Sequence, residues 1–196
     1  MSQPRLFEVA LIVATEFRIL EIPFLIGGSV ASLMHGESRL TNDVDFAAVM
    51  RDHHVAQFVK ALKGPFYADD VLIRDAIRRR GLFNVIHISS ASKIDVHVIE
   101  PDKFQRSQLE RSRRMRLIPE DETRVPIASP EDIVLQKLLW HRKSEGASER
   151  QLRDVLGVLK AQREKLDLAY MQSWARELDL TAMLDRLLRE AGIEPR

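Results

Sequence analysis

The chain has 196 residues, a length that suits one domain, or one core with a helical appendage. Its 30 Lys and Arg nearly balance its 29 Asp and Glu, and the resulting net charge of +1 excludes a uniformly basic surface for bulk nucleic-acid binding. The absence of cysteine excludes disulfides, thiolate metal sites and a cysteine nucleophile, and no apolar run reaches the roughly 18 residues of a membrane helix. We therefore expect a soluble, cytoplasmic protein with no membrane partner.

The first half of the chain alternates helical and strand patterns. Apolar residues that recur at spacings of three and four predict helices, and short apolar runs next to Gly, Pro or Ser predict strands. In chain order these are helix 4–20, strand 24–26, a helix that follows Gly27-Gly28-Ser29 and stops near Gly36, strand 44–50, helix 55–62, a helix from Asp69-Asp70 to Arg80, and a hairpin of strands 83–88 and 93–99.

After Pro101 the pattern changes. Residues 102–122 are dense in charge, and 124–127 predict a brief strand. Ser129-Pro130-Glu131-Asp132 is a strong helix start, because it combines a cap, a proline at the first position and two carboxylates at the positive helix end. Further helices are expected over about 148–159, 168–178 and 181–191. We predict an α+β fold with three parts: an α/β core over 1–101, a charged connector over 102–128 and a helical region over 129–196.

Three aspartates carry the chemistry that we expect. Asp43 and Asp45 lie two apart on a predicted strand, so both carboxylates project from one face. Asp95 lies on another predicted strand, where Lys93 and His97 share its face. Carboxylate oxygens with few other protein ligands are typical of Mg²⁺ held beside substrate phosphates, and three carboxylates suit two such ions. Lys93 would either contact a substrate phosphate or pair with Asp95. If Lys93 only neutralises Asp95, one of the two metal sites would be lost.

Gly27, Gly28 and Ser29 lie between a predicted strand and a predicted helix. Glycine lets a phosphate approach the backbone, the N–H groups at the start of a helix point outward, and a serine hydroxyl can donate a hydrogen bond. Taken alone, such a turn is more often an ordinary tight turn with a capping serine. The combination of this turn with Asp-x-Asp on the next strand favours a phosphate and metal site.

The segment Ile26-Gly27-Gly28-Ser29, followed after 13 residues by Asp43-Val44-Asp45-Phe46, resembles the signature of the nucleotidyltransferase superfamily related to DNA polymerase beta. Gly36-Glu37-Ser38-Arg39-Leu40-Thr41-Asn42 resembles the segment that precedes the aspartates in small bacterial members, and AbiEii-like and related uncharacterised families are the most similar. Ser129-Pro130-Glu131-Asp132, Lys137 and Arg153-Asp154 match the helical part of these proteins in order. The resemblance covers about residues 24–160.

The resemblance implies roles for individual residues. Asp43 and Asp45 would bind the metal, and Asp95 would be the third carboxylate, which orients or deprotonates the acceptor hydroxyl. Gly27, Gly28 and Ser29 would hold the nucleotide phosphates. Lys137 would reach the triphosphate, and Asp154 would place Lys137 or the acceptor.

The function expected from these residues is Mg²⁺-dependent transfer of a nucleoside monophosphate from an NTP to an acceptor hydroxyl on RNA, protein or a small molecule, with Mn²⁺ as an alternative ion. A non-catalytic nucleotide-binding or protein-interaction module of the same fold is the alternative, and a metal-dependent phosphohydrolase is a third reading. A homo-oligomer and a toxin–antitoxin setting are compatible with the sequence.

Overall fold

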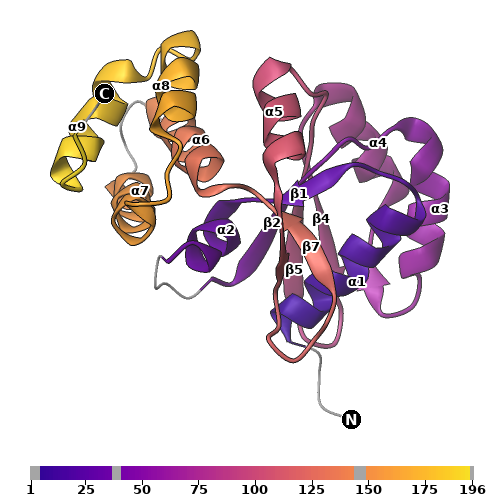
Figure 1. Cartoon of the computed structure of the whole chain (residues 1–196). Coiled ribbons are helices and arrows are strands. Elements are labelled where there is room, and N and C mark those ends of the chain that lie inside the picture. The colour runs from indigo at the N-terminus through magenta and orange to yellow at the C-terminus, as the bar shows by residue number, and fades with distance from the viewer. Residues whose placement is uncertain (1–4, 37–40, 144–148, 195–196) are drawn as a thin grey trace. The chain divides into compact units, whose positions relative to one another are not determined.

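The computed structural model describes residues 5–36, 41–143 and 149–194. Within these ranges the chain forms nine helices and a mixed seven-stranded sheet (Figure 1). In chain order the elements are α1 (Leu6–Ile19), β1 (Phe24–Ile26), α2 (Gly28–Met34), β2 (Asp43–Ala48), α3 (Asp52–Leu62), β3 (Phe66–Tyr67), α4 (Asp70–Arg79), β4 (Leu82–His87), β5 (Ser92–Val98), α5 (Lys103–Arg111), β6 (Arg113–Arg116), β7 (Arg124–Ile127), α6 (Pro130–Lys143), α7 (Glu149–Gln162), α8 (Leu168–Glu177) and α9 (Thr181–Glu190).

The chain divides into two compact units that do not follow chain order. The first consists of residues 1–27 and 41–127 and holds the whole sheet. The second consists of residues 28–40 and 128–196, so the short helix α2 belongs with the C-terminal helices. Residues 102–128, which we expected to form a charged connector, contain α5 together with β6 and β7 of the sheet.

The sheet of the first unit has the strand order β3-β4-β5-β2-β1-β7-β6. β2 and β5 are parallel neighbours at its centre, and β4 pairs with β5 as the antiparallel hairpin that the sequence predicts. β1 runs antiparallel to β2 and parallel to β7. The two strands that we predict to carry the aspartates are therefore direct neighbours.

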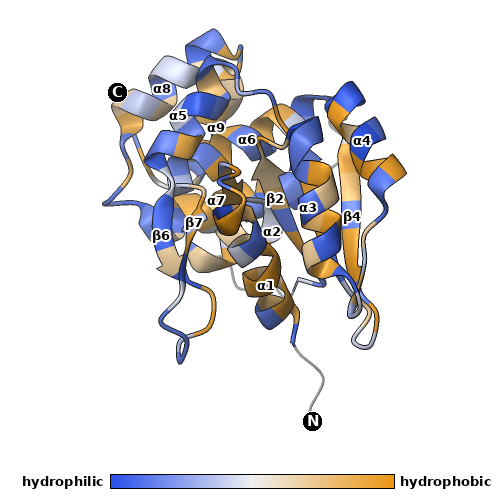
Figure 2. Ribbon diagram, turned by 90° about the vertical axis from the view of Figure 1, so that its right-hand side faces the viewer, coloured by the Kyte–Doolittle hydropathy of each residue, from blue (hydrophilic) through white to orange (hydrophobic). Residues whose placement is uncertain are grey.

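The two faces of the sheet differ in character because strand side chains alternate. One face is apolar: Phe46 and Val44 of β2 are fully buried, as are Ile94 and Val96 of β5. Figure 1 shows α1, α3 and α4 along one side of the sheet. The α1 ribbon is mostly hydrophobic in Figure 2, as its burial in the core of this unit requires. The residues between the apolar ones on β2 and β5 include the three candidate aspartates.

An aromatic cluster joins α1 to the apolar face. The Phe17 ring of α1 stacks on the Phe58 ring of α3 with centroids 5.2 Å apart, and meets Phe46 edge-on at 5.5 Å. The ring centroid of Phe24 on β1 lies 5.4 Å from that of Phe17. Such ring pairs add about 0.5–1.5 kcal/mol each beyond their buried area, so this cluster fixes α1 and α3 on the sheet.

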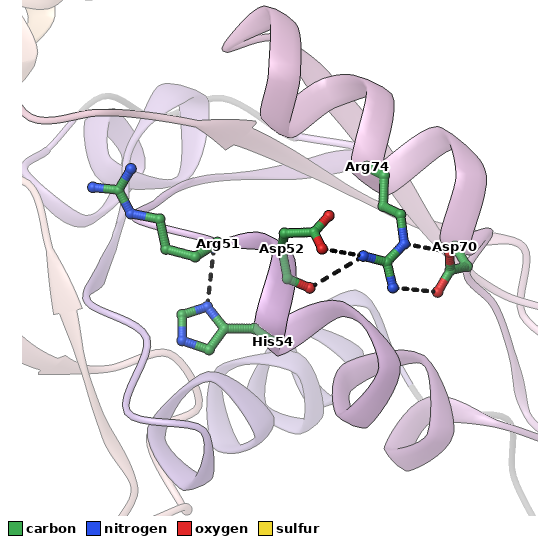
Figure 3. Close-up of polar contacts among 5 residues, drawn as sticks. All are labelled: Arg51, Asp52, His54, Asp70 and Arg74. Carbon is green, nitrogen blue, oxygen red and sulfur yellow. Dashed lines mark hydrogen bonds and ion pairs between the residues drawn. The ribbon is translucent and has the colours of Figure 1, made fainter.

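A polar cluster at the surface ties α3 to α4 (Figure 3). The Arg74 guanidinium of α4 donates to Asp70 at 2.7 Å and pairs with the Asp52 carboxylate at 2.6 Å. Hydrogen bonding to Asp70 and then to Asp52 raises the pKa of Arg74. At the start of α3, the Arg51 backbone N–H donates to Nδ1 of His54 at 3.0 Å, which satisfies a donor that the helix leaves unpaired.

The second unit is built around α6, whose start is capped as the sequence predicts. The Ser129 hydroxyl accepts from the Asp132 backbone N–H at 3.1 Å and donates to the Asp132 carboxylate at 2.7 Å. The Tyr170 hydroxyl of α8 donates to the other oxygen of Asp132 at 2.6 Å. Asp132 is fully buried, so these bonds replace the water that its carboxylate loses.

Contacts at its C-terminal end hold α2 in the second unit. His35 Nε2 lies 2.7 Å from the Ala128 carbonyl oxygen, and the Gln162 side-chain amide donates to the His35 carbonyl at 3.0 Å. Gly36 has a φ of +109°, and a Cβ atom there would lie 2.3 Å from that of Ala161. The glycine is therefore required both by its backbone conformation and by the close approach of α7.

The α+β class predicted from the sequence is confirmed, with helices beside a mixed sheet and further helices at the C-terminus. The charge-dense segment after Pro101, for which the sequence predicted only the brief strand over 124–127, contains further regular elements. It forms α5 and β6, and β3 is a further short strand that the sequence did not predict. Among the described helices, none combines the length and apolar character that crossing a membrane requires.

Candidate functional site

Asp43, Asp45 and Asp95 lie on the two central strands of the first unit. Asp45 of β2 is the direct register partner of Asp95 of β5, and Asp43 is the partner of Lys93. Residues that are paired in a parallel ladder and share the alternation project from the same face. Asp43 and Asp45 are partly exposed on either side of the buried Val44, whereas Asp95 is buried. The structure thus brings the predicted carboxylates together on one face.

Asp95 is the most fully engaged of the three. Its Oδ2 accepts from the Lys93 ammonium at 2.8 Å, and its Oδ1 accepts a short hydrogen bond from the side-chain amide of Asn84 on β4. The register that pairs Asn84 with Asp95 explains this contact. Both oxygens of the third carboxylate therefore already have protein partners.

The Lys93 ammonium is held among all three carboxylates. Its hydrogen bond to Asp95 raises the pKa of Lys93 against the opposing effect of desolvation, and the charges of Asp43 and Asp45 add to the rise. Its side chain is 43% exposed, compared with 10% for Asp95. Lys93 thus carries a positive charge at neutral pH and presents part of it to solvent.

Asp43 and Asp45 each contact a neighbouring polar side chain. The Thr41 hydroxyl lies 3.1 Å from Oδ1 of Asp43, and His97 Nε2 lies 3.5 Å from Oδ1 of Asp45. The expectation that Lys93, Asp95 and His97 share a face agrees with these contacts. Among the described residues, these contacts involve Oδ1 of each aspartate, whereas both oxygens of Asp95 accept hydrogen bonds.

The glycine turn begins beside Asp45. The Gly27 N–H donates to the Asp45 carbonyl at 2.9 Å, which continues the pairing of β1 with β2. Gly28 has a φ of +55°, a left-handed conformation that glycine adopts without strain, and it opens α2 with Ser29. Gly27 belongs to the first unit, whereas Gly28 and Ser29 belong to the second.

Lys137 and Asp154 form an ion pair inside the second unit. The Lys137 ammonium of α6 lies 2.6 Å from Oδ2 of Asp154 on α7, and their side chains are 5% and 4% exposed. The Gln151 side chain accepts a further bond from Lys137 at 3.1 Å. Asp154 was predicted to position either Lys137 or the acceptor. This contact is compatible with the first of these roles.

The donors on the sheet face are of a type that suits a hard divalent cation. Asp43 and Asp45 supply carboxylate oxygens, and Mg²⁺ is commonly held by one or two carboxylates together with water and phosphate. Among the described residues, no group of three or more His, Asp and Glu side chains is arranged to hold a metal ion. The donor set therefore fits an ion held by Asp43 and Asp45, and fits a three-carboxylate site less well because Asp95 is already paired.

Sequence reasoning missed Asn84. Its signal is a single amide among the apolar residues 82–86, but only the hairpin register shows that it faces Asp95. Residues 37–40, part of the segment that resembles small bacterial nucleotidyltransferases, lie outside the described residues. The individual roles of Asp43, Asp45, Asp95 and the other predicted site residues stay predictions.

Solved structures of other proteins resemble this fold along most of the chain, while no protein-family model and no curated protein matches the sequence. An antigenic nucleotidyltransferase-like protein from Paracoccidioides brasiliensis is similar over 99% of this chain and 96% of its own, with 18% sequence identity and a TM-score of 0.57. The antibiotic-resistance factor ANT(2″)-Ia is similar over 87% of this chain and 93% of its own, with 13% identity and a TM-score of 0.53.

At these identities the likeness concerns the fold. It agrees with the resemblance that the Gly-Gly-Ser and Asp-x-Asp segments carry, and it does not single out the AbiEii-like group, which stays a prediction. The chain has a nucleotidyltransferase-like fold.

Proposed function

We propose that the protein is a Mg²⁺-dependent nucleotidyltransferase that moves a nucleoside monophosphate from an NTP to an acceptor hydroxyl on RNA, protein or a small molecule. The observation that carries the proposal is the pairing of Asp45 with Asp95, beside Asp43, at the centre of a sheet with this fold. Asp43, Asp45 and Asp95 repel one another at close range, and the single ammonium of Lys93 offsets only part of their negative charge.

Asp43 and Asp45 are the residues that would hold the ion, and Mn²⁺ is the alternative to Mg²⁺. When bound, such an ion neutralises phosphate charge and polarises the reacting phosphoryl group. The protein's own part is to fix the two carboxylates in register on β2, where buried Val44 and Phe46 anchor the strand from the other face.

The transfer itself forms one bond and breaks one bond. The acceptor oxygen bonds to the α-phosphorus, the bond from that phosphorus to the bridging oxygen breaks, and pyrophosphate leaves. Asp95 would orient the acceptor hydroxyl or take its proton. Gly27, Gly28 and Ser29 would donate hydrogen bonds to phosphate oxygens, and Lys137, placed by Asp154, would neutralise the triphosphate.

One observation favours the alternative of a non-catalytic nucleotide-binding or protein-interaction module. Lys93 and Asn84 occupy both oxygens of Asp95, the group on which acceptor activation would depend. Nucleotide binding without transfer is the behaviour expected of that alternative. A homo-oligomeric state, a cytoplasmic location and a toxin–antitoxin setting stay predictions from the sequence.

The test is transfer of label from each of the four NTPs, labelled at the α-phosphate, in the presence of Mg²⁺ and of total cellular RNA, protein or small hydroxyl compounds. Label that reaches an acceptor, and that is lost in Asp43→Asn but kept in Glu120→Gln, supports the proposal. Glu120 is an exposed carboxylate of the same unit, so it controls for a general change of charge. Binding without transfer supports the module, and release of phosphate without transfer supports a phosphohydrolase.

A further inference from the structure

The third carboxylate of the candidate site is bound to a cation of the protein itself. Asp95 is 10% exposed, its Oδ2 lies 2.8 Å from the Lys93 ammonium, and its Oδ1 accepts from Asn84. A divalent ion that also bound Asp95 would approach within a few Å of a fixed positive charge and would be repelled. Asp95 is thus a poor metal ligand as long as Lys93 stays in place.

Lys93 reaches this position from the strand itself. Its backbone is the register partner of Asp43, and its side chain extends along β5 to Asp95, which is the partner of Asp45. The ammonium is close enough to Asp43 and Asp45 for their charges to act on it. The Lys93 ammonium is therefore close to all three carboxylates. The sequence pattern had suggested that a second metal ion would bind there.

On the basis of the proposed function, we propose that this site binds a single divalent ion through Asp43 and Asp45, and that the Lys93 ammonium, fixed by Asp95 and Asn84, supplies the second positive charge beside the substrate phosphates. Asn84 then positions Asp95, and Asp95 positions Lys93 instead of activating the acceptor hydroxyl. Because about two fifths of the Lys93 side chain is exposed, its ammonium can keep the hydrogen bond to Asp95 and still donate another to a phosphate oxygen.

A purely structural role for the pair is the competing explanation. The pair joins a partly exposed ammonium to a buried carboxylate, so a structural role predicts that loss of Lys93 lowers the stability of the fold and alters neither the number nor the affinity of bound ions. The proposal predicts the opposite, because removal of the ammonium frees Asp95 to act as a ligand.

The test counts Mn²⁺ bound to the full chain, by electron paramagnetic resonance of the free ion, with Mn²⁺ alone as the probe. The wild type should bind about one ion per chain, and Asp45→Asn should lose it. Lys93→Met should bind a second ion or bind the first about tenfold more tightly. Lys93→Arg, which keeps the charge, and Lys103→Met, an exposed lysine of the same unit, should behave as the wild type.

Two results would overturn the inference while leaving the proposed function intact. One is a wild type that binds two ions, and the other is a Lys93→Met variant whose stoichiometry and affinity stay within twofold of the wild type. The double variant Lys93→Met/Asp95→Asn should return to one ion, which assigns the gained site to Asp95. If no variant and no wild-type protein binds Mn²⁺, the metal-dependent function fails as well.

Discussion

Asp45 of β2 and Asp95 of β5 are register partners on parallel neighbouring strands, and their surroundings differ. Asp45 is approached by His97 Nε2 at 3.5 Å, whereas both oxygens of Asp95 accept hydrogen bonds from Lys93 and Asn84. Two carboxylates at one level of the sheet therefore have different partners. Under the proposed function, Asp45 would bind the ion and Asp95 would position Lys93.

The first prediction concerns Asp45. Asp45→Asn keeps the shape of the side chain and removes its charge, so Mg²⁺-dependent transfer should fall about 100-fold or more if Asp45 holds the ion. Steady-state transfer over a Mg²⁺ titration measures this effect, and thermal unfolding checks that the variant is folded. A variant that keeps wild-type activity at every Mg²⁺ concentration would remove Asp45 from the site.

The second prediction concerns the ion pair of Lys137 and Asp154. Asp154→Ala should lower the free energy of unfolding by about 3–5 kcal/mol, because it leaves a buried ammonium without its partner. The double variant Lys137→Met/Asp154→Leu should recover most of this loss, since apolar side chains can fill the same space. Urea unfolding of the wild type, the single variant and the double variant measures both the loss of stability and its recovery.

The same double variant separates stability from function. If Lys137 contacts the triphosphate as predicted, the stable double variant should still bind NTP more weakly than the wild type. Wild-type NTP affinity in that variant would restrict the pair to a structural role.

The third prediction concerns Gly36. Gly36→Ala should destabilise the second unit by about 2 kcal/mol or more, because the new Cβ would lie 2.3 Å from that of Ala161 and the φ of +109° disfavours a side chain. Gly64→Ala is the matched control: its φ is +110°, and nothing lies within 4 Å of the added Cβ.

Both variants share the backbone strain. The difference between their free energies of unfolding, measured by urea unfolding, therefore gives the cost of the close contact with Ala161. Equal losses in Gly36→Ala and Gly64→Ala would show that the approach of Ala161 costs nothing beyond that strain.

The fourth prediction concerns His54. Burial, followed by the charges of His53 and Arg51, lowers the pKa of His54 below its ordinary 6.5. The unfolded chain therefore binds the proton more readily than the folded one. The contribution of this residue to stability is complete above pH 6.5 and is lost as the pH falls through the lowered pKa of the folded state.

His54→Gln tests this linkage, because glutamine can still accept from the Arg51 N–H but carries no titrating proton. The free energy of unfolding of this variant, measured by urea unfolding at several pH values on either side of 6.5, should fall less on acidification than that of the wild type. Identical pH profiles would show that His54 does not contribute to acid sensitivity.

The sequence predicted most elements because their signals are local. The apolar stripe of α1, the Ser129 cap of α6 and the hairpin of β4 and β5 each depend on residues close together in the chain. α5 was missed because it lacks a clear apolar stripe, although its capping box was present: Asp102 accepts from the Gln105 backbone N–H at 2.7 Å. β6 is rich in arginine, and only pairing with β7 makes it a strand.

Part of the candidate site could also be predicted, because strand alternation is a local signal as well. That Asp43 and Asp45 share one face follows from strand alternation alone, and so does the common face of Lys93, Asp95 and His97. That Asn84 meets Asp95, and that Lys93 takes the other oxygen, depends on strand register and on side-chain placement.

Most helices and strands, the strand positions of the three aspartates and the resemblance to nucleotidyltransferases could be predicted from the sequence, because periodicity and motifs are properties of neighbouring residues. The folded structure was needed to show that β2 and β5 are neighbours, that α2 packs with α6 and α7, and that Asp95 is bound by Lys93 and Asn84. These features join residues far apart in the chain, and their free energy comes from burial and pairing that no local pattern records.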